Sequence, residues 1–162
     1  MASDEALAVY LNDHLAGAAA GIELAAKLRD NNQGTELGRD MVTLHHDITQ
    51  DRDALEALVG HLELERHPVK EAAGSMLEKL SRLRLNPALT GSAELTRLLE
   101  TEALSLGIEG KLSLWRSLKQ AAASDPRLAA AADYDRLIER ARGQRRTLEP
   151  HRLAAAVASF TG

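Results

Sequence analysis

The chain has no cysteine among its 162 residues, which excludes disulfides, thiolate metal sites and thiol catalysis. Aromatic residues make up only 2% of the sequence, so few rings are present to stack on bases or to build a β-sheet. The formal net charge is -4, and basic residues are interleaved with acidic ones rather than grouped. We therefore expect no nucleic-acid partner, because such binding needs a basic surface that neutralises phosphates.

Long apolar runs are also missing from the sequence. The most apolar stretch, residues 15–26, is short and is interrupted by Glu23, whereas a membrane-spanning helix needs roughly 20 apolar residues. The N-terminus lacks the basic region and continuous apolar segment of a signal peptide. We expect a cytoplasmic protein with no membrane association.

Helix-forming residues dominate what is present, chiefly Ala, Leu, Arg and Glu. Apolar residues recur at helical spacing, and Pro, Gly, Asn and Asp mark the breaks. Ser92 is a favourable N-cap, and Pro150 predicts a kink within the last helix rather than its end. The pattern predicts five helices, at about residues 4–29, 35–66, 69–85, 92–122 and 134–160.

The loop lengths predict how these helices are arranged. Short connections make helices 4–29 and 35–66 antiparallel neighbours, and they do the same for helices 92–122 and 134–160. The short helix at 69–85 then serves as the crossover between the two hairpins. The expected fold is a single all-α domain over residues 1–162, a ferritin-like four-helix bundle with an extra short crossover helix.

Three stretches carry a resemblance to a known family: YLNDHLAGAAAGIELA, HHDITQDRDALEALV and LLETEALSLGIEGKLSLWRSL. They resemble an uncharacterised bacterial family of small proteins with a ferritin-like fold. The resemblance covers most of the chain. It implies the fold and no particular activity.

Charged residues on apolar helix faces predict a polar seam in the core. Glu102 and Glu109 are two helical turns apart, and so are Arg145 and Arg152. If the hairpin centres near residue 128, Glu109 faces Arg145 and Glu102 faces Arg152. We interpret these pairs as buried salt bridges that fix the register of the helices, because a buried charge is costly unless it is paired.

The same register argument extends the seam into the first hairpin. With a centre near residue 33, His14 lies opposite Asp51 and Arg52. We expect His14 to contact one of these two residues at the edge of the core. The predicted seam therefore consists of Glu102, Glu109, Arg145, Arg152, His14 and Arg52.

A metal site is the alternative interpretation of these residues. Ferritin-like carboxylate sites use Glu-x-x-His on two helices, and no histidine in this chain has an acidic residue three positions before it. We therefore expect no cofactor. The alternative is a metal ion at an incomplete site built from Glu102, Glu109, His14 and Asp51.

Glycines inside two predicted helices have a structural interpretation. Gly17 and Gly21 have the small-xxx-small spacing that allows close helix approach. Gly107 and Gly110 flank Glu109, where they leave room for a bulky neighbour such as an arginine or Trp115. We read all four glycines as packing positions.

No motif in the sequence identifies a reaction. The function that the sequence favours is that of a non-enzymatic structural or interaction protein with a salt-bridged bundle core. The alternative is a metal- or small-ligand-binding protein that uses the polar seam. A second copy of the chain, or another protein, would bind through exposed helix faces.

Overall fold

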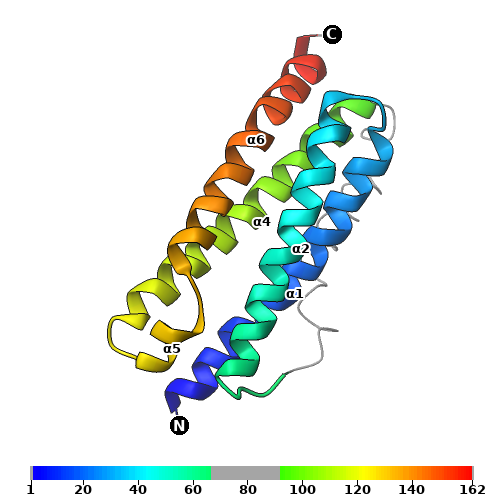
Figure 1. The fold of residues 1–162 in the computed structure, drawn as a ribbon. Helices are drawn as coiled ribbons and strands as arrows, with labels where there is room; N and C mark the ends of the chain where they lie inside the picture. Colours follow the sequence, from blue (N-terminus) through cyan, green and yellow to red (C-terminus); the bar gives the residue numbers. More distant parts are fainter. Residues whose placement is uncertain (1, 67–91, 162) are drawn as a thin grey trace.

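The computed structural model describes residues 2–66 and 92–161, and all regular secondary structure within these residues is helical (Figure 1). The predicted all-α class is confirmed. The predicted helix at 69–85 lies outside the described residues. The described helices are α1 (Ala2–Asn31), α2 (Glu36–His61), α4 (Ala93–Ala122), α5 (Pro126–Ala131) and α6 (Tyr134–Thr161).

Four long helices form two antiparallel hairpins, as the loop lengths predict (Figure 1). A tight turn joins α1 to α2, and the short helix α5 lies between α4 and α6. The most extensive contacts are those of α4 with α6 and of α1 with α2, while α1–α4 and α2–α6 contacts join the hairpins. The protein is thus built from two strongly packed pairs that meet along a smaller interface.

Polar side chains accept hydrogen bonds from amides in the first turns of α2, α4, α5 and α6. Thr35 Oγ1 accepts a hydrogen bond from the Gly38 amide, and the Ser92 hydroxyl accepts one from the amide of Leu95. Asp125 likewise caps α5 through the amide of Arg127. Each cap satisfies an amide that has no partner within its own helix.

The end of α2 differs from the prediction, because the helix stops at His61 rather than near residue 66. Glu63 has a positive φ of 54°, and its amide bonds to the Gly60 carbonyl. The amide of Leu64 bonds to the Val59 carbonyl, which completes a Schellman motif. Glycine normally occupies this left-handed position, so a glutamate there gave no sequence signal.

The connector between α4 and α6 also differs from the prediction. Residues 126–131, which lie between the predicted helices 92–122 and 134–160, form the additional short helix α5. The Tyr134 hydroxyl donates a hydrogen bond to the Leu128 carbonyl over 2.9 Å and ties α5 to the start of α6. Helix α6 continues through Pro150 to Thr161 without stopping, as predicted.

The core is formed by apolar residues from all four long helices, with Leu128 of α5 added at one end. Its largest fully buried side chains include Trp115 of α4 and Met41 of α2. None of the described helices combines the length and the apolarity that crossing a membrane requires.

The turn between α1 and α2 generates the first prediction. A Cβ atom at Gly38 would lie 2.1 Å from the carbonyl oxygen of Asn32, which itself accepts a bond from Thr35. Gly38→Ala should therefore destabilise the protein by about 1–3 kcal/mol, since backbone atoms must move. Chemical denaturation followed by circular dichroism measures this change.

Gly60→Ala is the matched control for this prediction. Gly60 is also a helical glycine of α2, but a Cβ there would meet no atom within 4 Å. Alanine should leave stability unchanged or raise it by up to about 1 kcal/mol. Equal effects of the two substitutions would show that the close approach at Gly38 is unimportant. A Cβ at Gly17, Gly21 or Gly110 would likewise meet no atom within 4 Å, so our interpretation of these three glycines as packing positions was wrong.

Candidate functional site

A buried carboxylate joins three helices at the middle of the bundle. Asp51 of α2 has a side chain only 1% exposed. Its Oδ1 accepts a hydrogen bond from Nε of Arg140 over 2.6 Å, and its Oδ2 accepts one from Nε2 of Gln144 over 2.8 Å, both from α6. The ammonium of Lys111, on α4, also bonds to Oδ2. We refer to Asp51, Lys111, Arg140 and Gln144 as the Asp51 network.

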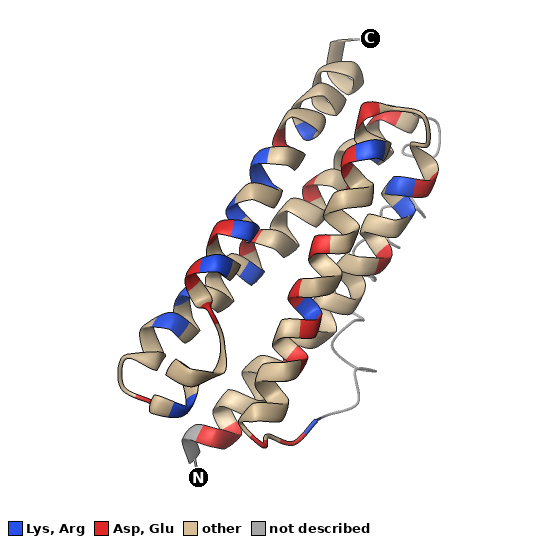
Figure 2. Cartoon of the chain, in the orientation of Figure 1, with Lys and Arg blue, Asp and Glu red and all other residues tan. Residues whose placement is uncertain are grey.

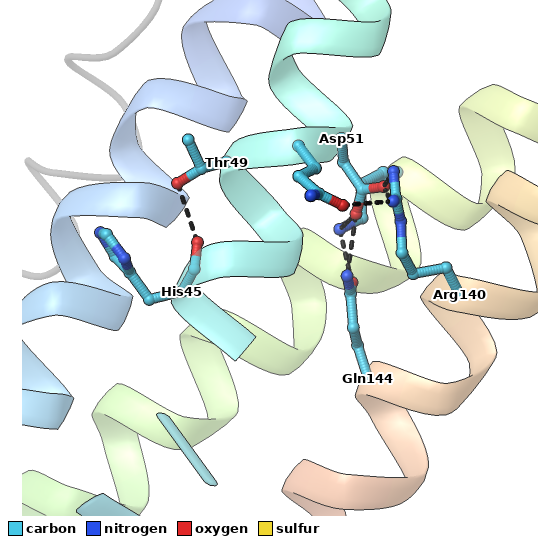
Figure 3. Close-up of polar contacts among 7 residues, drawn as sticks. His45, Thr49, Asp51, Arg140 and Gln144 are labelled. Carbon is cyan, nitrogen blue, oxygen red and sulfur yellow. Dashed lines mark hydrogen bonds and ion pairs between the residues drawn. The ribbon is translucent and has the colours of Figure 1, made fainter. Parts of the chain in front are cut away.

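The partners of Asp51 also contact one another and their surroundings (Figure 3). Lys111 donates to Oε1 of Gln144 over 2.5 Å, and Arg140 Nη1 donates to Oε1 of Gln50 over 3.0 Å. Burial lowers the pKa of the Lys111 ammonium, while the adjacent Asp51 carboxylate opposes that change. Every charged group of the network is therefore paired within the fold.

The distribution of charge over the helices suits this network (Figure 2). Helix α2 carries six acidic and two basic residues, and α6 carries three acidic and six arginines. Besides Asp51–Arg140, the Nε2 of His151 on α6 lies 2.7 Å from Oδ2 of Asp40 on α2. The hairpins thus meet here through polar side chains, among them the Asp51–Arg140 ion pair.

Two hollows border the Asp51 network. One, of about 250 Å³, lies between α1 and α4 and includes Asp51 and Lys111 in its lining. The other, of about 350 Å³, lies between α2 and α6 and is lined in part by Arg140 and Gln144. The network forms part of the wall of both.

A second set of polar contacts joins α1 to α4. Glu100, whose side chain is 8% exposed, forms an ion pair with Lys27. One turn away, Arg97 Nε donates to Oδ1 of the buried Asn32 over 3.0 Å, while the Asn32 amide donates to the Leu28 carbonyl. These contacts fix the end of α1 against the start of α4.

The predicted pairs of the polar seam are present, but they are not buried. Arg145 Nη1 lies 2.6 Å from Oε2 of Glu109, an ion pair without hydrogen-bond geometry. Arg152 Nη1 lies 3.5 Å from Oε1 of Glu102 and is bonded more closely to Glu149. The side chains of Arg145, Glu109 and Glu102 are 42–48% exposed. The register prediction was right and the buried placement was wrong, because these residues lie at the rim of the α4–α6 interface.

The predicted contact of His14 with Asp51 or Arg52 is not among the observed interactions. The His14 ring packs edge-on against Tyr10, with ring centroids 4.7 Å apart. Arg52 points to Asp53 and Glu56 on its own helix. Burial lowers the pKa of the His14 imidazole, and nearby Asp13 opposes that effect only in part.

The alternative metal site is not assembled in residues 2–66 and 92–161. No group of three or more His, Asp or Glu side chains there could hold a metal ion. Of the four candidates, Asp51 is held by cations, and Glu102 and Glu109 pair with arginines. His14 lines the α1–α4 hollow.

Sequence reasoning missed three members of the Asp51 network. Lys111 interrupts an apolar run of α4, and a lone lysine between Ile108 and Trp115 was the available signal. Arg140 and Gln144 are one turn apart and flank the apolar stripe of α6, but α6 is so rich in arginine that neither stood out. Asp51 itself was predicted as a site residue, with the wrong partners.

Comparison of the chain with protein families, with curated proteins and with solved structures finds no match.

The difference between buried and exposed pairs generates the second prediction. Asp51→Ala leaves Lys111 and Arg140, whose side chains are 14% and 18% exposed, without their carboxylate and should destabilise the protein by about 3–5 kcal/mol. Glu109→Ala is the matched control, since it removes a half-exposed partner and should cost only about 0.2–1 kcal/mol. Urea denaturation of both variants measures the difference. Similar losses would contradict the assignment of Asp51 as the central buried group.

The third prediction concerns acid stability. Burial lowers the pKa of His14 in the folded protein. In the unfolded chain the imidazole has its ordinary pKa of about 6.5, so the unfolded chain binds a proton at His14 more readily than the folded protein does. His14 should therefore destabilise the fold progressively as the pH falls below about 6.5 toward its lowered value. The variant His14→Gln should lose this part of the pH dependence, measured as the unfolding free energy between pH 5 and 7. An identical pH profile in the variant would contradict the prediction.

Proposed function

We propose that this chain is a non-enzymatic structural or interaction protein whose polar core holds its helices in register. The proposal is based on the hydrogen bonding of the Asp51 carboxylate. Its two carboxylate oxygens accept bonds from three side chains on two other helices. A carboxylate held in this way is poorly suited to binding a metal or accepting a proton from a substrate.

The composition of the network supports the same proposal. Lys111 and Arg140 both pair with the buried carboxylate of Asp51, so the arrangement favours one relative position of α2, α4 and α6. Buried polar groups are well known to specify register in helical assemblies. The network therefore suits a role in specifying structure.

We infer further that the bundle is of the ferritin-like type without the metal ligands of that type. The two antiparallel hairpins suit this assignment. So does the absence of any Glu-x-x-His spacing in the sequence.

An interaction role needs an accessible surface, and the end of α6 offers one. The large apolar side chains that the described residues expose include Leu153, Val157 and Phe160. Their spacing of four and three residues places them on one stripe of the helix, and Phe160 is 73% exposed. A second copy of the chain or another protein is the proposed partner of such exposed helix faces.

Metal content tests the proposal against its alternative. The protein, purified without chelators and dialysed, should contain far less than one iron or manganese per chain by elemental analysis. Its visible spectrum should show no absorption band. Near-stoichiometric metal that survives dialysis would overturn the proposal, and loss of that metal in Glu102→Gln or Glu109→Gln would identify the incomplete carboxylate site.

A further inference from the structure

Large apolar side chains near the end of α6 face away from the core. Leu153, Val157 and Phe160 are 50%, 61% and 73% exposed. They lie roughly 140–200° around the helix from Ala155, which is buried against the rest of the bundle. Both sides of α6 are therefore apolar here, a pattern typical of a helix that is buried all round. We refer to Leu153, Val157 and Phe160 as the α6 stripe.

The same side of α6 is charged nearer the start of the helix. There it carries Glu139, Arg142 and Arg146, whose side chains are 49–67% exposed and pair with one another. From Leu153 to Thr161, in contrast, the helix has no charged residue. A side that faced water along the whole helix would stay polar. The change in character therefore indicates that the α6 stripe makes a contact.

The neighbouring helix α2 does not extend along this part of α6. Asp40 and Asp51 are as far apart on α2 as Arg140 and His151 are on α6, so one antiparallel register fits both contacts. That register places residue 155 opposite the first residue of α2. The rest of α6 projects past α2 (Figure 1). A helix of another molecule can approach the α6 stripe from this end without meeting α2.

The area of the α6 stripe limits the strength of the contact. From their exposed fractions, the three side chains present roughly 300 Å² of apolar surface. Stable interfaces bury about 800 Å² on each partner. The stripe by itself therefore supports a weak and reversible complex.

A second copy of the chain fits the α6 stripe by symmetry. In a contact around a two-fold axis each copy presents the same surface, so like charges on that surface would meet and repel. The uncharged stripe avoids this repulsion. Leu153 and Phe160 are two helical turns apart and lie on one side of the helix. An antiparallel pairing centred midway between them places Leu153 of each copy opposite Phe160 of the other.

The same pairing matches charge at the ends of the stripe. Helix α6 has no basic residue in its own last turn, although the carbonyl end of a helix favours a nearby cation. The antiparallel register places Arg152 of each copy level with Thr161, in the last turn of the other copy. Arg152 is the charged residue that directly precedes the stripe, and its side chain is 23% exposed.

From these observations we propose that the α6 stripe is the contact surface of a weak, antiparallel, two-fold symmetric dimer of this chain. Leu153 packs against Phe160 of the second copy, and Val157 lies near the axis. The two bundles extend in opposite directions from the contact. This inference rests on the interaction role proposed above and names its partner.

Sedimentation equilibrium of the full-length protein measures the association. The average mass should rise from that of one 17.5 kDa chain toward twice that value, with a dissociation constant on the order of 100 µM. Val157→Glu places two like charges near the axis and should weaken the dimer by at least about 10-fold. Val42→Glu is the matched control, because Val42 is 58% exposed on α2. It should leave the dissociation constant within about twofold of the original.

Disulfide cross-linking tests the antiparallel register. The chain has no cysteine, so an introduced cysteine reports only on its own position. An oxidised mixture of Leu153→Cys and Phe160→Cys proteins should give mainly the mixed dimer, because a disulfide needs Cα atoms within about 7 Å. Either protein alone should cross-link slowly, since its two cysteines would lie about 10 Å apart along the helices. Val42→Cys gives the rate of random collision.

Three results would overturn the proposal. One is a chain that stays monomeric up to about 1 mM, which would leave a different protein as the partner of the stripe. Another is equal association of Val157→Glu and the original protein. A third is faster cross-linking of Leu153→Cys to itself than to Phe160→Cys, since that indicates a parallel contact. A metal-free monomer would defeat the dimer alone, whereas near-stoichiometric metal would defeat the proposed function at any mass.

Discussion

The burial of one carboxylate constrains the relative placement of three helices. Asp51 can be desolvated only if donors from α4 and α6 reach it together, because the cost of an unpaired buried charge exceeds the gain from most single contacts. That requirement sets the rotation and the height of α2 against both helices of the other hairpin. The apolar core alone would tolerate small shifts, since Leu and Ala side chains can repack. The Asp51 network does not tolerate them, because its hydrogen bonds are directional.

The charges of α2 and α6 support this placement at longer range. Helix α2 carries an excess of acidic residues, and α6 carries an excess of arginines (Figure 2). Asp51–Arg140 and Asp40–His151 are among the polar contacts between the two helices. In contrast, the exposed pairs Glu109–Arg145 and Glu102–Arg152 lie within the α4–α6 hairpin, where extensive apolar packing already fixes the register. The polar contacts that most constrain the arrangement of the helices are those between the hairpins.

The helices and their pairing could be predicted from the sequence because their signals are local. Ser92 as a cap, the turn before Thr35 and the periodicity of α2 each depend on a few neighbouring residues. The register of α4 against α6 could also be predicted, since residues equally distant from the centre of their connector face each other. The burial of the seam pairs could not be predicted from the sequence, because the exposure of Glu109 depends on how far apart the two hairpins lie. The Asp51 network joins residues 60 and 89 positions apart, and no pattern in a single sequence links them. The end of α2 was missed because Glu63 occupies a position that glycine usually marks.

The unequal contacts among the helices also bear on how the molecule opens. Each hairpin is held by local packing, whereas the hairpins are joined to each other through a smaller interface that includes the Asp51 and Glu100 ion pairs. Contacts that are close in sequence form early and cost little loop-closure entropy. The α1–α2 and α4–α6 units therefore have the character of separate cooperative blocks. Amide protons within one block should exchange together, and separation of the blocks would expose the central carboxylate to water before either hairpin unwinds.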